Sequence, residues 1–373
     1  MKQVLKFIGW IVIILLSVVA VLLVIVVLKS PGKADPYELS DGTTPVRSLS
    51  EIVSLNIGDT RQSLIIKSND SLNPVLLYVH GGPGSPEFVF MEHFGSQIDQ
   101  VFTVCYWEQL GAGKSYYPNI DPALMSLNKF VDDGAVVSSY LKQRFGKEKI
   151  FLMGHSWGSM LGSYMAARYP DHFYAYFGIG QVANQLLAEQ ISYDWVLEMA
   201  NQKGDKKGIA QLTEIGRPPY DNIDETLTNL LIERKYVAKY GGSIYNGNFY
   251  KEASIAILNS REYTLKDKIN FFRGMTFSLS QLWSEVMLRN LFDEVPMQTI
   301  PVYMFQGIHD YQTAYPVAKA YFDSLQAPHK EFHSFLYSAH SPNFEEPALT
   351  DSLLNAILIS DFPQTLSMEG RRE

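Results

Sequence analysis

The sequence predicts an α/β fold in which a mostly parallel central sheet is flanked by helices. Short, continuous apolar runs recur along the chain, as expected for strands that are covered on both faces. Stretches with helical spacing of apolar residues separate most of these runs. Residues 184–294 differ, because they show helical periodicity and no convincing strand. We therefore expect one sheet that is interrupted by a helical insertion.

An apolar segment at the N-terminus, residues 1–29, is predicted to be a transmembrane signal anchor. Residues 7–28 carry no charge, and as a helix they are long enough to span the roughly 30 Å hydrocarbon layer. A cleaved signal peptide is the alternative, but its apolar region is usually about 7–15 residues long. Residues 30–46, rich in Pro, Gly, Ser and Asp, are predicted to form a linker that holds the domain off the bilayer.

Basic residues around this segment predict its orientation. Lys2 and Lys6 precede the apolar run, whereas Lys29 and Lys33 follow it. A short basic N-terminus ahead of a single helix favours an N-terminus on the inside. We therefore expect a single-pass membrane protein whose folded domain lies on the extracytoplasmic side.

The core of the fold is predicted to comprise residues 47–183 and 295–373, on either side of the insertion. Residues 51–57 and 62–67 are expected to form an opening hairpin. Further strands are expected at residues 74–80, 102–107, 149–153, 174–179, 302–306 and 331–337, and helices at residues 127–145, 160–168, 314–325 and 347–359. Since the insertion 184–294 leaves and re-enters the sheet, it should form a helical cap (lid) above the carboxyl edge, where open α/β sheets bind ligands.

Composition and charge exclude several kinds of partner. The 373 residues carry 31 Lys and Arg against 39 Asp and Glu, which gives a formal net charge of −8. Because phosphate binding depends on clustered basic residues, nucleic acid is not expected as a partner. Cys105 is the single cysteine, so no intramolecular disulfide and no thiolate metal site can form. We expect Cys105 to be a small core residue.

A glycine-flanked serine is the candidate nucleophile. Gly154-His155-Ser156-Trp157-Gly158 fits the G-x-S-x-G nucleophile elbow of α/β hydrolases, in which the serine occupies a sharp strand-to-helix turn. The pentapeptide alone occurs by chance in many chains. Here it follows the strand expected at residues 149–153 and is followed directly by a helix, which is the setting that the motif requires. The sequence therefore predicts an α/β-hydrolase fold with Ser156 as nucleophile.

Attack by a serine creates an oxyanion, which preorganised backbone N–H groups can stabilise. Trp157, the residue after the nucleophile, is expected to supply one donor. The second is expected from the loop His80-Gly81-Gly82-Pro83-Gly84, where glycines allow the backbone to approach closely. We nominate Gly82, with Gly81 as the next choice.

The base and the acid should follow the serine in the order Ser, Asp or Glu, His. Asp310 lies just past the strand expected at residues 302–306, and His340 just past the strand expected at residues 331–337. Of the histidines, His340 alone has both this order and this location. We therefore predict the triad Ser156, Asp310 and His340, with Asp293 as a more distant alternative acid.

Two other patterns do not lead to a cofactor or metal site. Gly111-Ala112-Gly113-Lys114-Ser115 ends like a phosphate-binding loop, but Glu108 stands where that motif needs a glycine. The histidines between residues 329 and 340 could suggest a metal site, but they are expected to be strand and loop residues without a carboxylate cluster. We expect no metal and no cofactor, since serine hydrolysis requires neither.

With these motifs, residues 48–359 resemble the prolyl iminopeptidase family of α/β hydrolases, serine aminopeptidases that remove an N-terminal residue, often proline, from peptides. The blocks that carry the resemblance are residues 80–84, 107–115 and 154–158. Members of the family usually read Asp-Gln-Arg-Gly in the second block, so Glu108 and Leu110 are departures, and an arginine that pairs internally is missing. His155 stands where many members have glycine.

The resemblance implies that one or two carboxylates of the cap bind the free amino group of the substrate. Glu189, Glu198, Glu214 and Glu285 are the candidates, and none of them can be matched to the family pattern. Each is also compatible with an ordinary solvated charge on a helix.

The sequence thus predicts a serine hydrolase that acts through an acyl-enzyme on a peptide or another small substrate, and it favours an aminopeptidase. Two alternatives stay open. An esterase or lipase-like enzyme would use the same triad on small esters. A membrane-tethered binding module would reuse the fold without catalysis.

Overall fold

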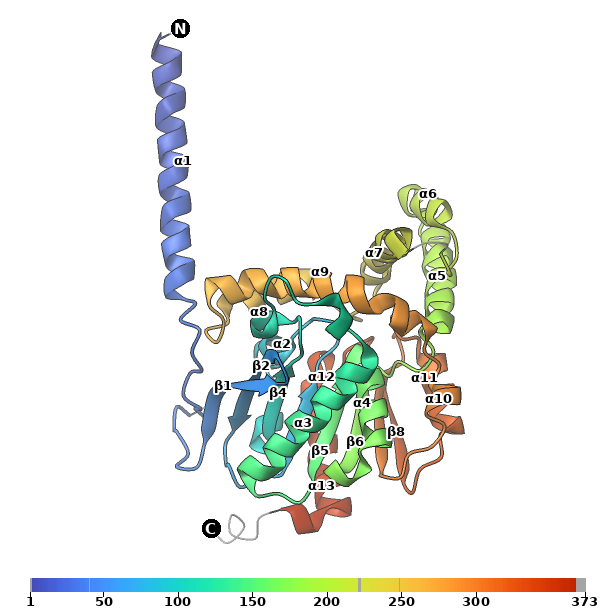
Figure 1. Ribbon diagram of the computed structural model, residues 1–373. Helices are drawn as coiled ribbons and strands as arrows, with labels where there is room; N and C mark the ends of the chain where they lie inside the picture. Colours follow the sequence, from blue (N-terminus) through green and yellow to red (C-terminus); the bar gives the residue numbers. More distant parts are fainter. Residues whose placement is uncertain (1, 40, 221–222, 248, 367–373) are drawn as a thin grey trace.

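The computed structural model describes residues 2–39, 41–220, 223–247 and 249–366 of the chain. Within these residues an 8-stranded sheet forms the centre, in the order β1-β2-β4-β3-β5-β6-β7-β8 (Figure 1). β1 pairs antiparallel with β2, β2 antiparallel with β4, and all later neighbours pair in parallel. The strands are β1 (Leu49–Ile57), β2 (Thr60–Ser68), β3 (Val75–Val79), β4 (Thr103–Glu108), β5 (Ile150–His155), β6 (Phe173–Ile179), β7 (Val302–Gly307) and β8 (Lys330–Phe335).

Helices cover both faces of the sheet, as the continuous apolar runs predict. Alternate residues of β3 point into different layers: Leu77 and Val79 belong to one buried cluster, and Leu76 and Tyr78 to another. The helices of the core are α2 (Phe88–Phe94), α3 (Leu127–Phe145), α4 (Trp157–Arg168), α11 (Tyr315–Ser324), α12 (Pro342–Glu345) and α13 (Pro347–Asp361). Residues 367–373, the end of the predicted core segment, lie outside the described residues.

The insertion between β6 and β7 is helical and forms the cap. Its helices are α5 (Gln185–Gln202), α6 (Lys206–Ile215), α7 (Ile223–Tyr240), α8 (Phe249–Asn259), α9 (Leu265–Leu288) and α10 (Leu291–Glu294). α9 lies across the top of the sheet, while α5, α6 and α7 stand up at one end of it (Figure 1). These three helices share a small apolar core of their own, which includes Val196, Leu212 and Val237. The cap therefore sits over the carboxyl ends of the parallel strands.

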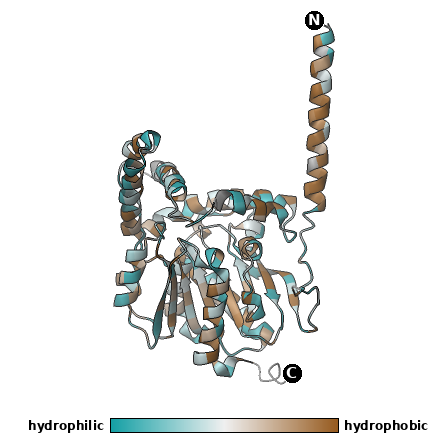
Figure 2. Cartoon of the chain, turned by 180° about the vertical axis from the view of Figure 1, so that it is seen from behind, coloured by the Kyte–Doolittle hydropathy of each residue, from teal (hydrophilic) through white to brown (hydrophobic). Residues whose placement is uncertain are grey.

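The N-terminal helix α1 (Lys2–Leu28) stands away from the domain and is hydrophobic along most of its length in this view (Figure 2). Lys6–Leu28 has a hydropathy of 3.7 and is long and apolar enough to cross a membrane, as a signal sequence also is. The apolar window of this helix is not buried against the rest of the described chain.

The segment after α1 is packed on the cap, contrary to the expected linker that holds the domain away from the bilayer. Pro31 forms a bridge with Thr264, and the amides of Gly32 and Lys33 donate to the carbonyl of Arg261 at 3.0 and 3.2 Å. These backbone bonds fix the first residues of the expected linker. Pro31 and Gly32 allow the backbone to approach the α8–α9 loop closely, and they do not make this part of the segment flexible.

Candidate active site

Ser156 occupies the sharp turn between β5 and α4. Its φ of 55° and ψ of −124° are unusual for a residue with a side chain and typical of a nucleophile elbow. Its amide donates to the carbonyl of Ile179 at 2.9 Å. A Cβ atom on Gly154 would lie 2.1 Å from the carbonyl oxygen of Gly158, and one on Gly158 would lie 2.0 Å from that of Val79. Close packing of backbone against backbone therefore requires both glycines.

His340 and Asp310 form a buried pair in the loops that follow β8 and β7. His340 Nδ1 lies 2.9 Å from Asp310 Oδ2, and Asp310 also accepts hydrogen bonds from the hydroxyl of Thr313 and the side chain of Gln306 at 2.7 Å each. Burial opposes ionisation of Asp310, but the charge and hydrogen bond of His340 outweigh it and hold the pKa of Asp310 below its usual value. An ionised Asp310 can hold the proton on Nδ1, which leaves Nε2 of His340 to act as a base.

Ser156 lies where two cavities meet. One cavity, of about 230 Å³, is mainly apolar and extends under the cap. Its walls include Ser156, Trp157, Leu230, Met275, Leu279, Trp283 and Val286. The other cavity, of about 180 Å³, is lined by Ser156 and His340 together with more polar groups. The structure thus brings the predicted nucleophile and base to one concave surface. The alternative acid Asp293 is exposed on α10 and accepts a hydrogen bond from Asn290.

The expected oxyanion donors differ in whether their backbone amides are available to bind an oxyanion. Trp157 is the first residue of α4, where amides have no acceptor within the helix. Gly82 lines both cavities with a φ of 112°, a value that glycine adopts without strain. Gly81 is different, because its amide donates to Glu87 Oε1 at 2.8 Å. Gly81 is therefore not available as the second choice of donor.

A buried carboxylate, Glu87, and a buried histidine, His155, which the sequence analysis did not single out as a pair, line the smaller cavity beside Ser156 and His340. His155 Nδ1 is 2.8 Å from Glu87 Oε1, and Tyr78 donates to Glu87 Oε2 at 2.6 Å. His155 Nε2 faces the carbonyl oxygen of His340 at 3.2 Å. Burial opposes charge on both partners, but their mutual attraction outweighs it: the pKa of His155 lies above, and that of Glu87 below, its usual value. The pair connects the Gly81 loop to the loop of His340.

The segment that follows β4 supports the elbow and the cap. Gln109 accepts a hydrogen bond from the Trp157 indole at 2.9 Å and donates to the carbonyl of His80 at 3.0 Å. Glu108 accepts hydrogen bonds from the Lys114 amide and from the hydroxyl of Tyr263, which belongs to the cap. Burial raises the pKa of Glu108 to about 7. Tyr263 of the cap thus contacts a carboxylate that is buried at the end of β4.

Of the four expected cap carboxylates, Glu189 lies closest to the cavity. It is 2 % exposed and forms an ion pair with Arg234 of α7. Glu233, which the sequence analysis missed, is fully buried with Oε1 at 3.6 Å from Arg234 Nη1. Burial and the neighbouring Glu189 raise the pKa of Glu233 to about 8. Arg234 and Gln185 line the cavity, and the two carboxylates lie behind them.

The other three expected carboxylates are placed elsewhere. Glu198 and Glu214 are exposed on α5 and α6, where Glu198 accepts a hydrogen bond from Gln202. Glu285 accepts a hydrogen bond from the Leu127 amide at the start of α3 and pairs with Arg289. None of the three lines either cavity at Ser156. Their helical positions point them toward solvent or toward the core helix, so they do not form an amine site.

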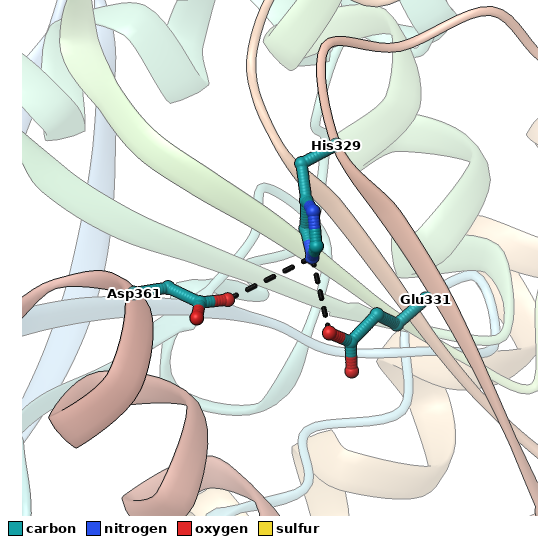
Figure 3. Close-up of side chains that lie close together, drawn as sticks. All are labelled: His329, Glu331 and Asp361. Carbon is teal, nitrogen blue, oxygen red and sulfur yellow. Dashed lines mark hydrogen bonds and ion pairs between the residues drawn. The ribbon is translucent and has the colours of Figure 1, made fainter.

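One group of side chains within the described residues has the spacing for a metal ion, and it lies far from Ser156. His329, Glu331 and Asp361 meet at the amino end of β8 (Figure 3), with His329 Nε2 at 3.0 Å from Glu331 Oε1 and 3.7 Å from Asp361 Oδ2. All three are exposed or half-exposed. Their mutual ion pairs account for the arrangement.

Comparison with known proteins shows the family of the chain. The α/β hydrolase fold family matches residues 74–347 of the chain. The probable aminopeptidase YbaC of Bacillus subtilis (strain 168) is 34% identical over 312 residues, which cover 83% of this chain and 96% of that protein. The chain belongs to the α/β-hydrolase family. Curated and structural relatives that are named proline iminopeptidases confirm the motif-based resemblance of this hydrolase to that family.

Further relatives of this α/β hydrolase carry related names. A proline iminopeptidase of Heyndrickxia coagulans is 24% identical over 293 residues, covering 78% of this chain and 93% of that protein. The crystal structure of a proline iminopeptidase-related protein of Thermus thermophilus has a TM-score of 0.60 at 18% identity, covering 85% of this chain and all of that one. The latter likeness confirms the predicted fold class.

Proposed function

We propose that this α/β hydrolase is a serine aminopeptidase that releases an N-terminal residue from peptides through an acyl-enzyme. The observation that supports the chemistry best is the His340–Asp310 pair at 2.9 Å, whose histidine shares a cavity with Ser156 on its strained turn. The names of the relatives support the substrate class. The proposal needs no metal and no cofactor.

In the proposed mechanism, Ser156 Oγ attacks the substrate carbonyl while His340 takes its proton. The amides of Gly82 and Trp157 stabilise the oxyanion. His340 then gives the proton to the leaving amine, and a water molecule, activated by the same imidazole, hydrolyses the acyl-enzyme. Asp310 keeps the imidazole oriented and stabilises its protonated form.

Recognition of the substrate amine is assigned to Glu189 and Glu233. They are buried carboxylates behind the wall of the cavity, and an ammonium group would offset the cost of burying their charge. In this proposal the ammonium competes with Arg234, which already pairs with both. Selectivity for a free N-terminus then depends on the free-energy cost of displacing Arg234 from the two carboxylates.

A carboxylesterase is the second candidate, because the cavity wall presents Arg234 and not a carboxylate, and its remaining lining is mainly apolar. An uncharged acyl chain would fill such a cavity without displacing the arginine. Ester substrates would use the same triad and oxyanion donors.

We propose further that α1 is a retained membrane anchor, with the hydrolase domain on the extracytoplasmic side. The length and hydropathy of Lys6–Leu28 support a spanning helix. The docking of residues 31–33 on the cap supports retention, because a cleavage there would remove part of a packed surface.

The test uses the full chain in detergent or bilayers, with prolyl and other aminoacyl arylamides, their N-acetylated counterparts and a short-chain ester. Cleavage of free arylamides with loss on acetylation is expected. Cleavage of the ester alone would replace the aminopeptidase by the esterase. Ser156→Ala should lower kcat by about 10⁴-fold or more on either substrate class, and undiminished turnover by that variant would exclude the mechanism.

A further inference from the structure

The point at which α1 leaves the domain is fixed on the cap. Ser30 is 6% exposed and its hydroxyl accepts a hydrogen bond from Lys268 of α9 at 2.8 Å. Lys268 also donates to the carbonyl of Leu258 at the end of α8, at 2.6 Å. Since α1 ends at Leu28, the bilayer that receives it lies within a few residues of the corner between α8 and α9.

Apolar and basic side chains share the exposed side of this corner. Ile269 and Phe272 on α9 are 45% and 50% exposed, and Leu258 on α8 is 54% exposed. Lys266 and Arg273 are exposed beside them, and neither has an ion-pair partner within the described part of the chain. Residues 266, 269, 273 and 276 recur at helical intervals and therefore share one face of α9.

This face has the composition of a helix that lies at a membrane surface. Apolar side chains of such helices enter the boundary between headgroups and acyl chains, while Lys and Arg contact anionic lipid. The whole chain carries a net charge of −8, so a basic stripe with unpaired cations is a local departure from its general charge.

The arrangement of the helices agrees with such a contact. α9 runs crosswise to α1 and begins beside its foot (Figure 1), and the view from behind shows the same relation (Figure 2). The turn between α5 and α6 rises on the same side as α1 and carries the exposed Lys203, Lys206 and Lys207. The turn between α5 and α6 reaches further along the axis of α1 than α9 does (Figure 1). A bilayer surface that contacts both the turn and α9 therefore requires α1 to cross the bilayer at a tilt. Transmembrane helices are tilted by about 20° on average.

We propose that the N-terminal half of α9, with Leu258, rests on the surface of an anionic lipid bilayer, the same bilayer that α1 spans. This inference depends on the proposed anchor. α9 also supplies Met275, Leu279 and Trp283 to the cavity at Ser156, so docking holds one wall of that cavity at the membrane surface. The cap is thus positioned by two attachments: the packed segment after α1 and the lipid contact of α9.

The experiment uses the full chain in vesicles of phosphatidylcholine and phosphatidylglycerol that contain spin-labelled lipid as a fluorescence quencher. An environment-sensitive fluorophore is attached at Ile269→Cys, and at Ile359→Cys as the matched control. Ile359 is 48% exposed near the end of α13, at the opposite edge of the sheet, and the native Cys105 is fully buried. A third variant, Leu16→Cys, reports on α1.

We expect strong quenching at residues 16 and 269 and little at residue 359. Charge reversal of Lys266 or Arg273 to Glu should lower the docked fraction at residue 269, by about fivefold in its ratio to the undocked form for each residue. Quenching at 16 with none at 269 would overturn the docking and leave the anchor intact. Absence of quenching at 16 as well would overturn the anchor, and the docking with it. Neither result depends on turnover, so failure of the aminopeptidase proposal is seen separately.

Discussion

At the carboxyl edge of the sheet the buried carboxylates of Asp310 and Glu87 have hydrogen-bond partners on both oxygens, whereas the buried charges of the cap are only partly paired. Asp310 accepts hydrogen bonds from His340, Thr313 and Gln306, and Glu87 accepts them from His155, Tyr78 and Gly81. In the cap, Oε2 of Glu189, both carboxylate oxygens of Glu233 and Nη1 of Arg234 have no hydrogen-bond partner within the described residues.

The difference indicates different tasks. A saturated network holds reacting groups in one geometry, which is what acyl transfer requires. Buried charged atoms without hydrogen-bond partners destabilise the fold unless a ligand supplies those partners. We therefore expect changes at the edge of the sheet to act mainly on kcat, and changes in the cap to act on substrate affinity and on stability.

The largest effect is expected for Asp310→Asn. An amide can still accept the bonds from Thr313 but cannot hold the His340 Nδ1 proton as an anion does, so kcat should fall by about 10⁴-fold. The measurement is turnover of the best substrate, with circular dichroism to check the fold. Asp293→Asn, at an exposed acid of α10, is the control and should leave kcat unchanged. A larger loss for Asp293→Asn than for Asp310→Asn would move the acid to the alternative position.

The second effect concerns the Glu87–His155 pair, which we expect to position the reacting groups from the wall of the smaller cavity. Glu87→Gln removes the charge that favours protonated His155 and loosens the link between the Gly81 loop and the His340 carbonyl. We expect kcat to fall by about 10- to 100-fold, the cost of about 1.4 to 2.7 kcal/mol in the barrier, with KM changed by less than about twofold. Steady-state kinetics measure both.

Glu92→Gln is the matched control for that variant. Glu92 lies on α2, close in sequence, and pairs with Lys67 at the surface, where it is 40% exposed. Its loss should change neither kcat nor KM. A rise in KM with constant kcat for Glu87→Gln would contradict a positioning role.

Much of the scaffold could be predicted because short-range patterns determine it. The helix expected at residues 127–145 has those bounds in the structure, since Ser126 caps its start and Gly146 adopts a left-handed conformation at its end. The strand expected at residues 331–337 ends earlier, at Phe335, because Leu336 and Tyr337 turn outward and are exposed. Motif order was enough to select Asp310 and His340, which the structure brings into contact.

The groups that sequence reasoning missed depend on contacts between distant segments. Glu87 and His155 lie 68 positions apart, and only the packing of the loop after β3 against β5 brings them together. Glu189 and Arg234 belong to helices whose relative register no local pattern specifies. The departure of His155 from the usual glycine was a signal for such a contact, because a buried histidine needs a partner.

In the cap, Glu233→Gln should change how stability varies with pH. Burial raises the pKa of Glu233 from 4.5 to about 8 in the folded chain. Between these values the unfolded chain releases the proton and the folded chain keeps it, so stability falls as pH rises, by up to about 1.4 kcal/mol per pH unit. The stabilising effect is complete below pH 4.5 and lost through pH 8. Glu233→Gln should remove this part of the fall.

The measurement compares unfolding free energies of both chains at pH 5 and pH 8. Other buried carboxylates, such as Glu108 and Glu345, contribute the same fall to both chains and cancel in the difference. Glu214→Gln, on the exposed surface of α6, is the control. If the unfolding free energy of the wild type and of Glu233→Gln falls equally between pH 5 and pH 8, Glu233 is already ionised as a partner of Arg234. The cap and the sheet edge would then not differ in how their buried carboxylates are paired.

The smallest effect is expected where cap and sheet edge meet. Tyr263→Phe removes the hydroxyl that donates to Glu108 at 2.5 Å. The carboxyl stays buried with one donor fewer, so the chain should lose about 1 kcal/mol of stability and the pKa of Glu108 should rise further. Tyr337→Phe, at a side chain that is 67% exposed, is the control and should change stability by less than about 0.5 kcal/mol. If urea unfolding shows no difference between the two variants, the Tyr263–Glu108 contact does not help to hold the cap to the sheet, and the Lys114–Asp267 ion pair is the next contact to test.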